Sequence, residues 1–174
     1  TLWKAVMGKN PSRYKGANLP VGQVSWNDCQ KFILKLNQLT GKSFRLPTEA
    51  EWEFAARGGN KSKGYQYSGS NSLDDVAWYK NNSGDAIHAV GTKQPNELGI
   101  YDMSGNVWEW CQDVKGAYGS FPQTNPAGSV NGVSRIQRGG CWNWDSWFCR
   151  ISERCSSLPT SCGFADGLRL ALTE

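Results

Sequence analysis

The chain has 174 residues, which is enough for one domain with a sizeable hydrophobic core. Its net charge is only +4, no cluster of Lys and Arg follows a predicted helix, and no nucleic-acid motif is present, so we expect no nucleic-acid partner. No apolar run approaches the ~18 residues that a membrane-spanning helix requires, so we expect no membrane span.

The N-terminal segment predicts a short helix over residues 1–7 that ends near Gly8. Because the chain starts inside this amphipathic pattern, we expect a longer parent protein whose missing N-terminal segment carries any export signal or lipid anchor. Residues 21–24 predict a short strand.

The strongest helix signal covers residues 25–40. Ser25 and Asp28 are spaced as a capping box at its start, and Gly41 is a typical residue just after a helix end. Its apolar residues recur at helical spacing, which predicts one buried face: Trp26, Cys29, Phe32, Ile33, Leu36 and Leu39.

A second helix is predicted over residues 48–57, after an extended segment at residues 44–47. Thr48 and Glu51 form a second capping box. Three glutamates at the start of this helix are interpreted as negative charge favoured by the helix dipole, not as catalytic carboxylates: Glu49, Glu51 and Glu53.

The middle of the chain predicts short strands between long loops. Residues 107–111 alternate, so that Val107 and Glu109 share one face while two tryptophans share the other. Residues 115–133 form a long loop, and residues 135–140 predict another strand.

Six cysteines allow 15 disulfide pairings, but no pair has zinc-like spacing. Cys29 is expected to be a buried small apolar residue. For the cysteines near the C-terminus, a disulfide and free thiols both remain open.

The last third of the chain follows neither a helical nor a strand period. Aromatic and small polar residues in such a segment are typical of a binding loop. We expect Trp142 to be core and at least two of Trp144, Trp147 and Phe148 to be exposed. The candidate ligand-binding residues are Trp144, Asp145, Trp147, Phe148, Ser152, Glu153, Cys155, Ser156, Ser157, Leu158, Thr160, Ser161, Cys162, Phe164, Ala165 and Asp166.

Five motifs in order, spread over nearly the whole chain, resemble the formylglycine-generating enzyme and sulfatase-modifying factor family. They are NLPVGQVSW (18–26), RLPTEAEWE (45–53), GIYDMSGNVWEW (99–110), RGG (138–140) and GLRL (167–170). The resemblance implies one α+β domain over residues 1–174 with a C-type-lectin-like fold, in which two helices pack on small antiparallel sheets with much irregular structure.

The enzymes of this family use a pair of cysteines that bind copper, at the fourth and ninth positions after the Arg-Gly-Gly motif. Here the ninth position is Cys149 but the fourth is Trp144, so the resemblance implies no enzymatic activity. A related branch with histidine-ligated iron is also excluded, because His88 is the only histidine.

Several short motifs in the last third of the chain, called the C-terminal anchors below, resemble the fixed positions of the variable proteins of diversity-generating retroelements. Such proteins are found on spirochaete surfaces. These anchors are RGG-C-W-N (138–143), Cys149-Arg150, Arg154, Pro159 and GLRL (167–170). The resemblance implies a variable region at about residues 138–170 on a monomeric, receptor-like or adhesin-like protein at the cell surface or outside the cell. Its ligand would be a macromolecule, such as a protein on another cell or on a host surface.

Two alternatives from other classes are a copper-dependent oxidase that forms formylglycine and a calcium-dependent lectin. The lectin alternative depends on two short motifs, QPN (94–96) and WND (26–28).

Family resemblance also implies a structural calcium site, while no other cofactor is required. Its ligands would be Asp102, Gly105, Val107 and Glu109, since calcium takes carboxylate and carbonyl oxygens. The alternative is that Asp102 caps a turn and Glu109 pairs with a cation.

Overall fold

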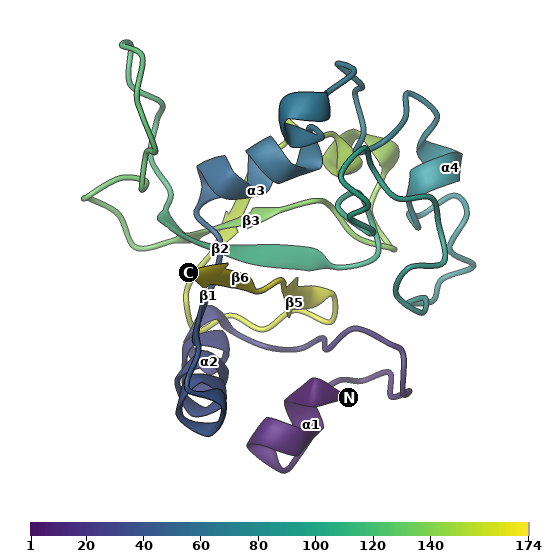
Figure 1. Ribbon diagram of the computed structural model, residues 1–174. Coiled ribbons are helices and arrows are strands. Elements are labelled where there is room, and N and C mark those ends of the chain that lie inside the picture. The colour runs from purple at the N-terminus through teal and green to yellow at the C-terminus, as the bar shows by residue number, and fades with distance from the viewer. Residues whose placement is uncertain (174) are drawn as a thin grey trace.

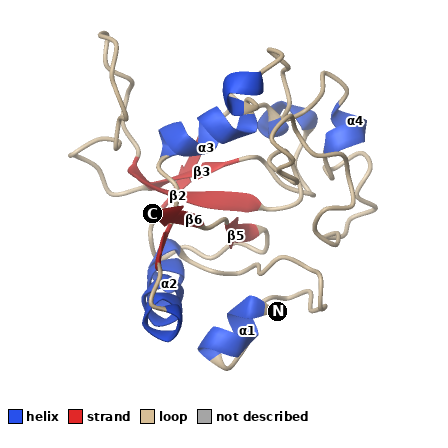
Figure 2. Cartoon of the chain, viewed as in Figure 1, coloured by secondary structure: helices blue, strands red, loops and turns tan. Residues whose placement is uncertain are grey.

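The computed structural model describes residues 1–173 (Figures 1 and 2). No helix within these residues is both long and apolar enough to cross a membrane. In chain order the elements are α1 (Leu2–Met7), α2 (Trp26–Thr40), β1 (Ser43–Arg45), α3 (Glu49–Ala56), the 3-10 helix η1 (Gly59–Lys61), α4 (Leu73–Val76), β2 (Trp108–Val114), β3 (Arg135–Arg138), the 3-10 helix η2 (Ser146–Cys149), β4 (Cys155–Ser157), β5 (Asp166–Leu168) and β6 (Ala171–Thr173).

Two small sheets organise the chain. The larger has the strand order β4-β3-β2-β5, and the smaller pairs β1 with β6. Most pairs are antiparallel, as predicted, but β5 runs parallel to β2. This pairing follows from the path of residues 158–165, which carry the chain from the β4 edge to the opposite edge of the sheet.

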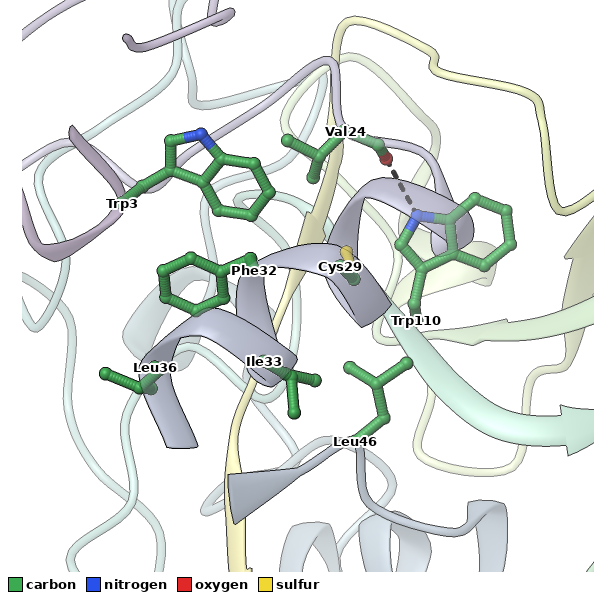
Figure 3. Close-up of a cluster of buried hydrophobic side chains, with 8 residues drawn as sticks. All are labelled: Trp3, Val24, Cys29, Phe32, Ile33, Leu36, Leu46 and Trp110. Atoms are coloured by element: carbon green, nitrogen blue, oxygen red, sulfur yellow. Dashed lines mark hydrogen bonds between the residues drawn. The ribbon is translucent and has the colours of Figure 1, made fainter. Parts of the chain in front are cut away.

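Helices cover both faces of the larger sheet: α3 lies on one face, and α2 with α1 lies toward the other (Figure 1). Alternation along β2 explains how one strand serves both layers. Trp110 packs among the α2 residues in one core cluster (Figure 3), whereas Cys111 belongs to a second cluster with Trp52 of α3. The predicted alternation is therefore confirmed for Trp110 and Cys111. Val107 precedes the strand and packs in the same cluster as Trp108, so its predicted place on the face opposite Trp108 is wrong.

Local sequence signals place the helix starts correctly. Ser25 begins α2 and Thr48 begins α3, each with the reciprocal hydrogen bonds of a capping box. The strand predicted at residues 21–24 is wrong, because that segment joins no ladder. The segment makes one backbone–backbone hydrogen bond, from the Val24 N–H to the Asp166 carbonyl at 3.3 Å.

The acidic start of α3 does more than the helix dipole requires. Glu51 completes the capping box and pairs with Arg45 at 2.6 Å. Glu49 is buried, and its two oxygens accept hydrogen bonds from Arg154 at 2.6 Å each. The dipole interpretation is therefore incomplete: this helix anchors an arginine that lies 105 residues away in the C-terminal segment.

All six cysteines are free thiols in the structure. Cys29 is fully buried in the α2 cluster, as predicted. Residues 115–133 form the predicted long loop, which extends away from the rest of the chain at the upper left of Figure 1.

Candidate functional site

The C-terminal segment and the larger sheet together enclose a pocket of about 370 Å³. Strand pairing builds it: Trp108 of β2 is in register with Asp166 of β5, and Gln137 of β3 is in register with Cys155 of β4. The pocket is lined by Trp108, Gln137, Cys141, Asn143, Trp144, Cys155, Ser157, Ser161, Gly163, Phe164, Ala165 and Asp166.

Aromatic rings form much of the wall of this pocket. The Trp144 ring meets Trp108 edge to face, with centroids 5.6 Å apart, and Phe148 at 4.5 Å. Trp144 remains 39% exposed and Phe164 is 51% exposed. Large rings that are fixed on one side and open on the other are suited to contact a ligand.

Asp166 supplies the charge in the pocket, since every other lining residue is uncharged. It is 8% exposed, and its Oδ2 accepts a hydrogen bond from the Gly163 N–H at 2.6 Å. Burial raises the pKa of Asp166, and the Gly163 N–H and the nearby Gln137 amide oppose that rise.

Gln137 lies beside Asp166 and is 2% exposed. Its Nε2 has no hydrogen-bond acceptor at bonding geometry within residues 1–173. A buried amide without a partner is uncommon, because leaving it unpaired costs about 1–3 kcal/mol. The pocket therefore combines aromatic walls with polar groups that are not fully satisfied.

The structure brings many of the predicted ligand-binding residues to this face. Trp144 and Trp147 are exposed and Trp142 is buried, as predicted. Seven of the predicted residues line the pocket, namely Trp144, Cys155, Ser157, Ser161, Phe164, Ala165 and Asp166.

Other predicted residues lie outside the pocket. Exposed positions among them are Asp145, Trp147, Ser152, Leu158, Thr160 and Cys162, while Phe148, Glu153 and Ser156 are partly buried. Ala165 and Asp166 are themselves buried, because β5 pairs with β2, and so they form the interior of the pocket and not its exposed surface.

Sequence reasoning missed five lining residues: Trp108, Gln137, Cys141, Asn143 and Gly163. Trp108 and Gln137 belong to the central strands and therefore resembled core residues. The parallel register of β5 against β2 places them beside Asp166, and no local signal in the sequence encodes that register.

The predicted calcium ligands do not fit a cation. Both oxygens of Glu109 accept hydrogen bonds from Arg169, at 2.7 and 2.9 Å, and Oε2 also accepts one from Trp52 Nε1 at 2.7 Å. Asp102 Oδ2 accepts a hydrogen bond from the Gly91 N–H at 2.7 Å. This arrangement favours the alternative in which Glu109 pairs with a cationic side chain and Asp102 holds a turn.

Removing divalent metal is therefore expected to leave stability unchanged. We expect the melting temperature to be the same in EDTA as in millimolar calcium, because the guanidinium of Arg169 already neutralises Glu109. Differential scanning fluorimetry measures this directly. A fall in melting temperature that calcium reverses and magnesium does not would establish a calcium site instead.

The two lectin-like motifs lie elsewhere and serve the fold. Asp28 closes the capping box of α2, with Ser25 Oγ donating to its carboxylate at 2.6 Å. Asn96 is buried and donates to the Ala55 carbonyl at 2.8 Å.

Comparison with known proteins identifies the family. The family model for the sulfatase-modifying factor enzyme 1-like domain matches residues 1–174. The chain belongs to this family. The chaperone protein LppX of Paenibacillus barcinonensis is 37% identical over 191 residues, covering 80% of this chain and 65% of the relative. The formylglycine-generating enzyme of Streptomyces coelicolor is 34% identical, covering 97% of this chain and 60% of that enzyme.

The chain thus spans less than two thirds of the length of these curated relatives. The solved structure of Treponema denticola variable protein 1 superimposes with a TM-score of 0.89 at 33% identity, covering 97% of this chain and 79% of that one. The predicted C-type-lectin-like fold of the formylglycine-generating enzyme subtype is confirmed.

The family resemblance implies a copper-binding cysteine pair at the positions of Trp144 and Cys149, and the structure places these two residues in different surroundings. Trp144 is a partly exposed ring at the pocket, whereas Cys149 is fully buried, and burial raises the pKa of its thiol to about 12. A copper–thiolate site requires deprotonated sulfur ligands, so these two residues do not fit a two-thiolate copper site.

Proposed function

We propose that this chain is a non-enzymatic binding protein that displays a variable ligand-binding site over about residues 138–170. The observation that carries the proposal is the exposed Trp144 at the mouth of the C-terminal pocket, at the position where the family's enzymes hold a cysteine. That substitution replaces a thiolate with a large rigid contact surface.

The likeness to Treponema denticola variable protein 1 supports the proposal over 97% of the chain. Packing of the segment also supports it. Its anchors are held from within, since Arg138 is fully buried and Arg154 is paired with Glu49. The residues between the anchors, such as Trp147 and Leu158, are exposed and can change without opening the core.

The ligand proposed for this site is a macromolecule, such as a protein on another cell or on a host surface. Trp147, Phe164 and Leu158 would make apolar contacts with the ligand. The exposed serines and threonines around them would supply adaptable hydrogen bonds. A monomer displayed at the cell surface or outside the cell would suit this role.

Sequencing the genome around the coding segment tests the proposal. We expect a near-repeat of the segment for residues 138–170 beside a reverse transcriptase gene. In clonal cultures we expect substitutions confined to positions where the repeat has adenine, with the codons of Arg138, Cys149 and Gly167 unchanged. A coding segment without such a repeat, and without variation among clones, would overturn it.

A copper-dependent oxidase is the second candidate, because the Streptomyces coelicolor enzyme is 34% identical over nearly the whole chain. We expect no stoichiometric copper to remain after gel filtration of copper-loaded protein. One copper per chain that is lost in a Cys149→Ser variant, together with oxygen consumption in the presence of a cysteine peptide, would favour the oxidase.

A further inference from the structure

We propose that the C-terminal pocket takes a basic side chain of a protein partner, lysine or arginine, with its charge against Asp166 and its methylene stem between the aromatic rings. This inference rests on the proposed binding function and names the chemistry of the ligand at that same site.

Asp166 differs from the other buried carboxylates in its surroundings. Glu49 and Glu109 each form an ion pair with a guanidinium. Burial raises the pKa of Asp113, and the nearby charge of Arg154 partly opposes that rise. Asp166 has no ion pair within residues 1–173, and no cationic side chain acts on its pKa. A buried carboxylate is costly unless a cation accompanies it.

The burial of Asp166 also makes the free energy of unfolding depend on pH. Because burial raises the pKa of Asp166 above its unfolded value, the folded state binds the proton more tightly, and this contribution to stability is lost as pH rises through the folded pKa. At pH values above the folded pKa, the ionised carboxylate therefore destabilises the empty pocket. A ligand cation would offset this effect, which is a source of binding free energy.

The shape and lining of the pocket fit a single side chain. A volume of about 370 Å³ lies at the small end of the range of ~300–1,000 Å³ for ligand sites. The lining contains one carboxylate and no cationic residue. Trp108, Trp144 and Phe164 present aromatic surface, which attracts both the methylene stem and the charge of a basic side chain.

Two further features of the site bear on how it would hold a cation. The guanidinium of Arg13 lies over the Phe164 ring at 4.9 Å, so this ring already holds a planar cation within the chain. Inside the pocket, the buried Gln137 amide has an unpaired Nε2. The Oε1 of the same amide is an acceptor that an incoming N–H donor could use.

Selectivity for a cation would depend on the aspartate that this chain carries at position 166. Trp108 and Gln137 are on the central strands β2 and β3, before the proposed variable region, whereas Asp166 lies within it. A different residue at position 166 would change the chemistry of the ligand while the walls from β2 and β3 remain.

Titration with three small amides tests the proposal on the full chain. The probes are the Nα-acetyl methylamides of lysine, arginine and norleucine, because norleucine has a similar apolar stem without the charge. Binding is measured from the shifts of the tryptophan indole N–H signals in ¹H–¹⁵N spectra. We expect lysine or arginine amide to bind at least tenfold more tightly than norleucine amide, with Trp108 and Trp144 responding.

The matched variants are Asp166→Asn and Asp75→Asn. Asparagine at 166 keeps the size and an oxygen for the Gly163 N–H, so we expect the advantage of the basic amides over norleucine to disappear. Asp75 is an exposed carboxylate outside the pocket, and its variant should bind as the unaltered protein does.

Equal binding of all three amides, or of none, would overturn the cation proposal, and this comparison on the unaltered protein decides it even if Asp166→Asn fails to fold. Those results would not affect the proposed function if the near-repeat of the segment for residues 138–170 is found beside a reverse transcriptase gene. A missing repeat with tight, Asp166-dependent binding of a basic amide would instead remove the variable-site proposal and keep the cation pocket.

Discussion

Replacing Arg138 with alanine is expected to lower the free energy of unfolding by about 3–5 kcal/mol. The Arg138 guanidinium is fully buried and pairs with Glu53, while its Nε lies 3.5 Å from Glu49. It also donates to the carbonyls of Ile151, at 2.9 Å, and Glu153. Without this side chain, two carboxylates lose a partner and two carbonyls in the C-terminal segment lose their donors.

Chemical denaturation followed by circular dichroism measures this loss. Arg57→Ala is the matched control, because Arg57 pairs with the same Glu53 at 2.6 Å but is 46% exposed. Pairs of this kind between residues four apart on a helix contribute about 0.3–0.5 kcal/mol. Equal effects of the two substitutions would show that burial of Arg138 does not stabilise the C-terminal segment.

Replacing Trp110 with alanine is expected to cost a similar amount, about 3–5 kcal/mol. Trp110 is completely buried against α2, and its Nε1 donates to the Val24 carbonyl at 2.9 Å (Figure 3). The substitution leaves a cavity between β2 and α2, and it also leaves a buried carbonyl unpaired. Thermal and urea unfolding of the two proteins would measure the difference.

Trp147→Ala serves as the comparison for this second variant. Trp147 is 58% exposed and lies against Arg150 at 3.2 Å from the ring centroid. We expect its removal to change stability by no more than about 1 kcal/mol. If the two tryptophan variants unfold at the same urea concentration, Trp110 does not join the sheet to α2 as the structure indicates.

The effects expected at Arg138 and Trp110 explain how the proposed variable surface could be tolerated by the fold. The C-terminal segment is fixed through groups that point inward, mainly arginines that reach α3 and rings that reach the core. Exposed residues between them, such as Trp147 and Leu158, make few of these connections. Substitutions there should alter binding while the free energy of unfolding changes little.

Much of the helical structure was readable from neighbouring residues. Both capping boxes and the glycine that ends α2 depend on contacts within four residues along the chain. The apolar face of α2 was also readable, except that Leu39 in its last turn is exposed and not buried as predicted. The alternation of β2 was readable for the same reason, since side chains on successive residues of a strand point to opposite faces. The motif order also identified the family and its fold.

The short segment at residues 21–24 shows where such reasoning fails. Its composition suits a strand, but a strand exists only if a partner backbone is available along its length, and here the contact is a single bond to Asp166. The acidic start of α3 shows the same limit, because the dipole argument accounts for Glu51 but not for the burial of Glu49 against Arg154.

Motif order and local periodicity identified the family, the main helices, the central strands and the exposed aromatic residues near the C-terminus. Long-range contacts in the folded chain bring Asp166 and Gln137 into one pocket, pair Arg169 with Glu109, and carry Arg154 and Arg138 to α3. The physical reason is distance along the chain. Caps and periodic faces are set by residues a few positions apart. The ion pairs of Glu109 with Arg169 and of Glu49 with Arg154 join residues 60 and 105 positions apart, and strand register likewise pairs residues that are distant along the chain, as in Trp108 with Asp166.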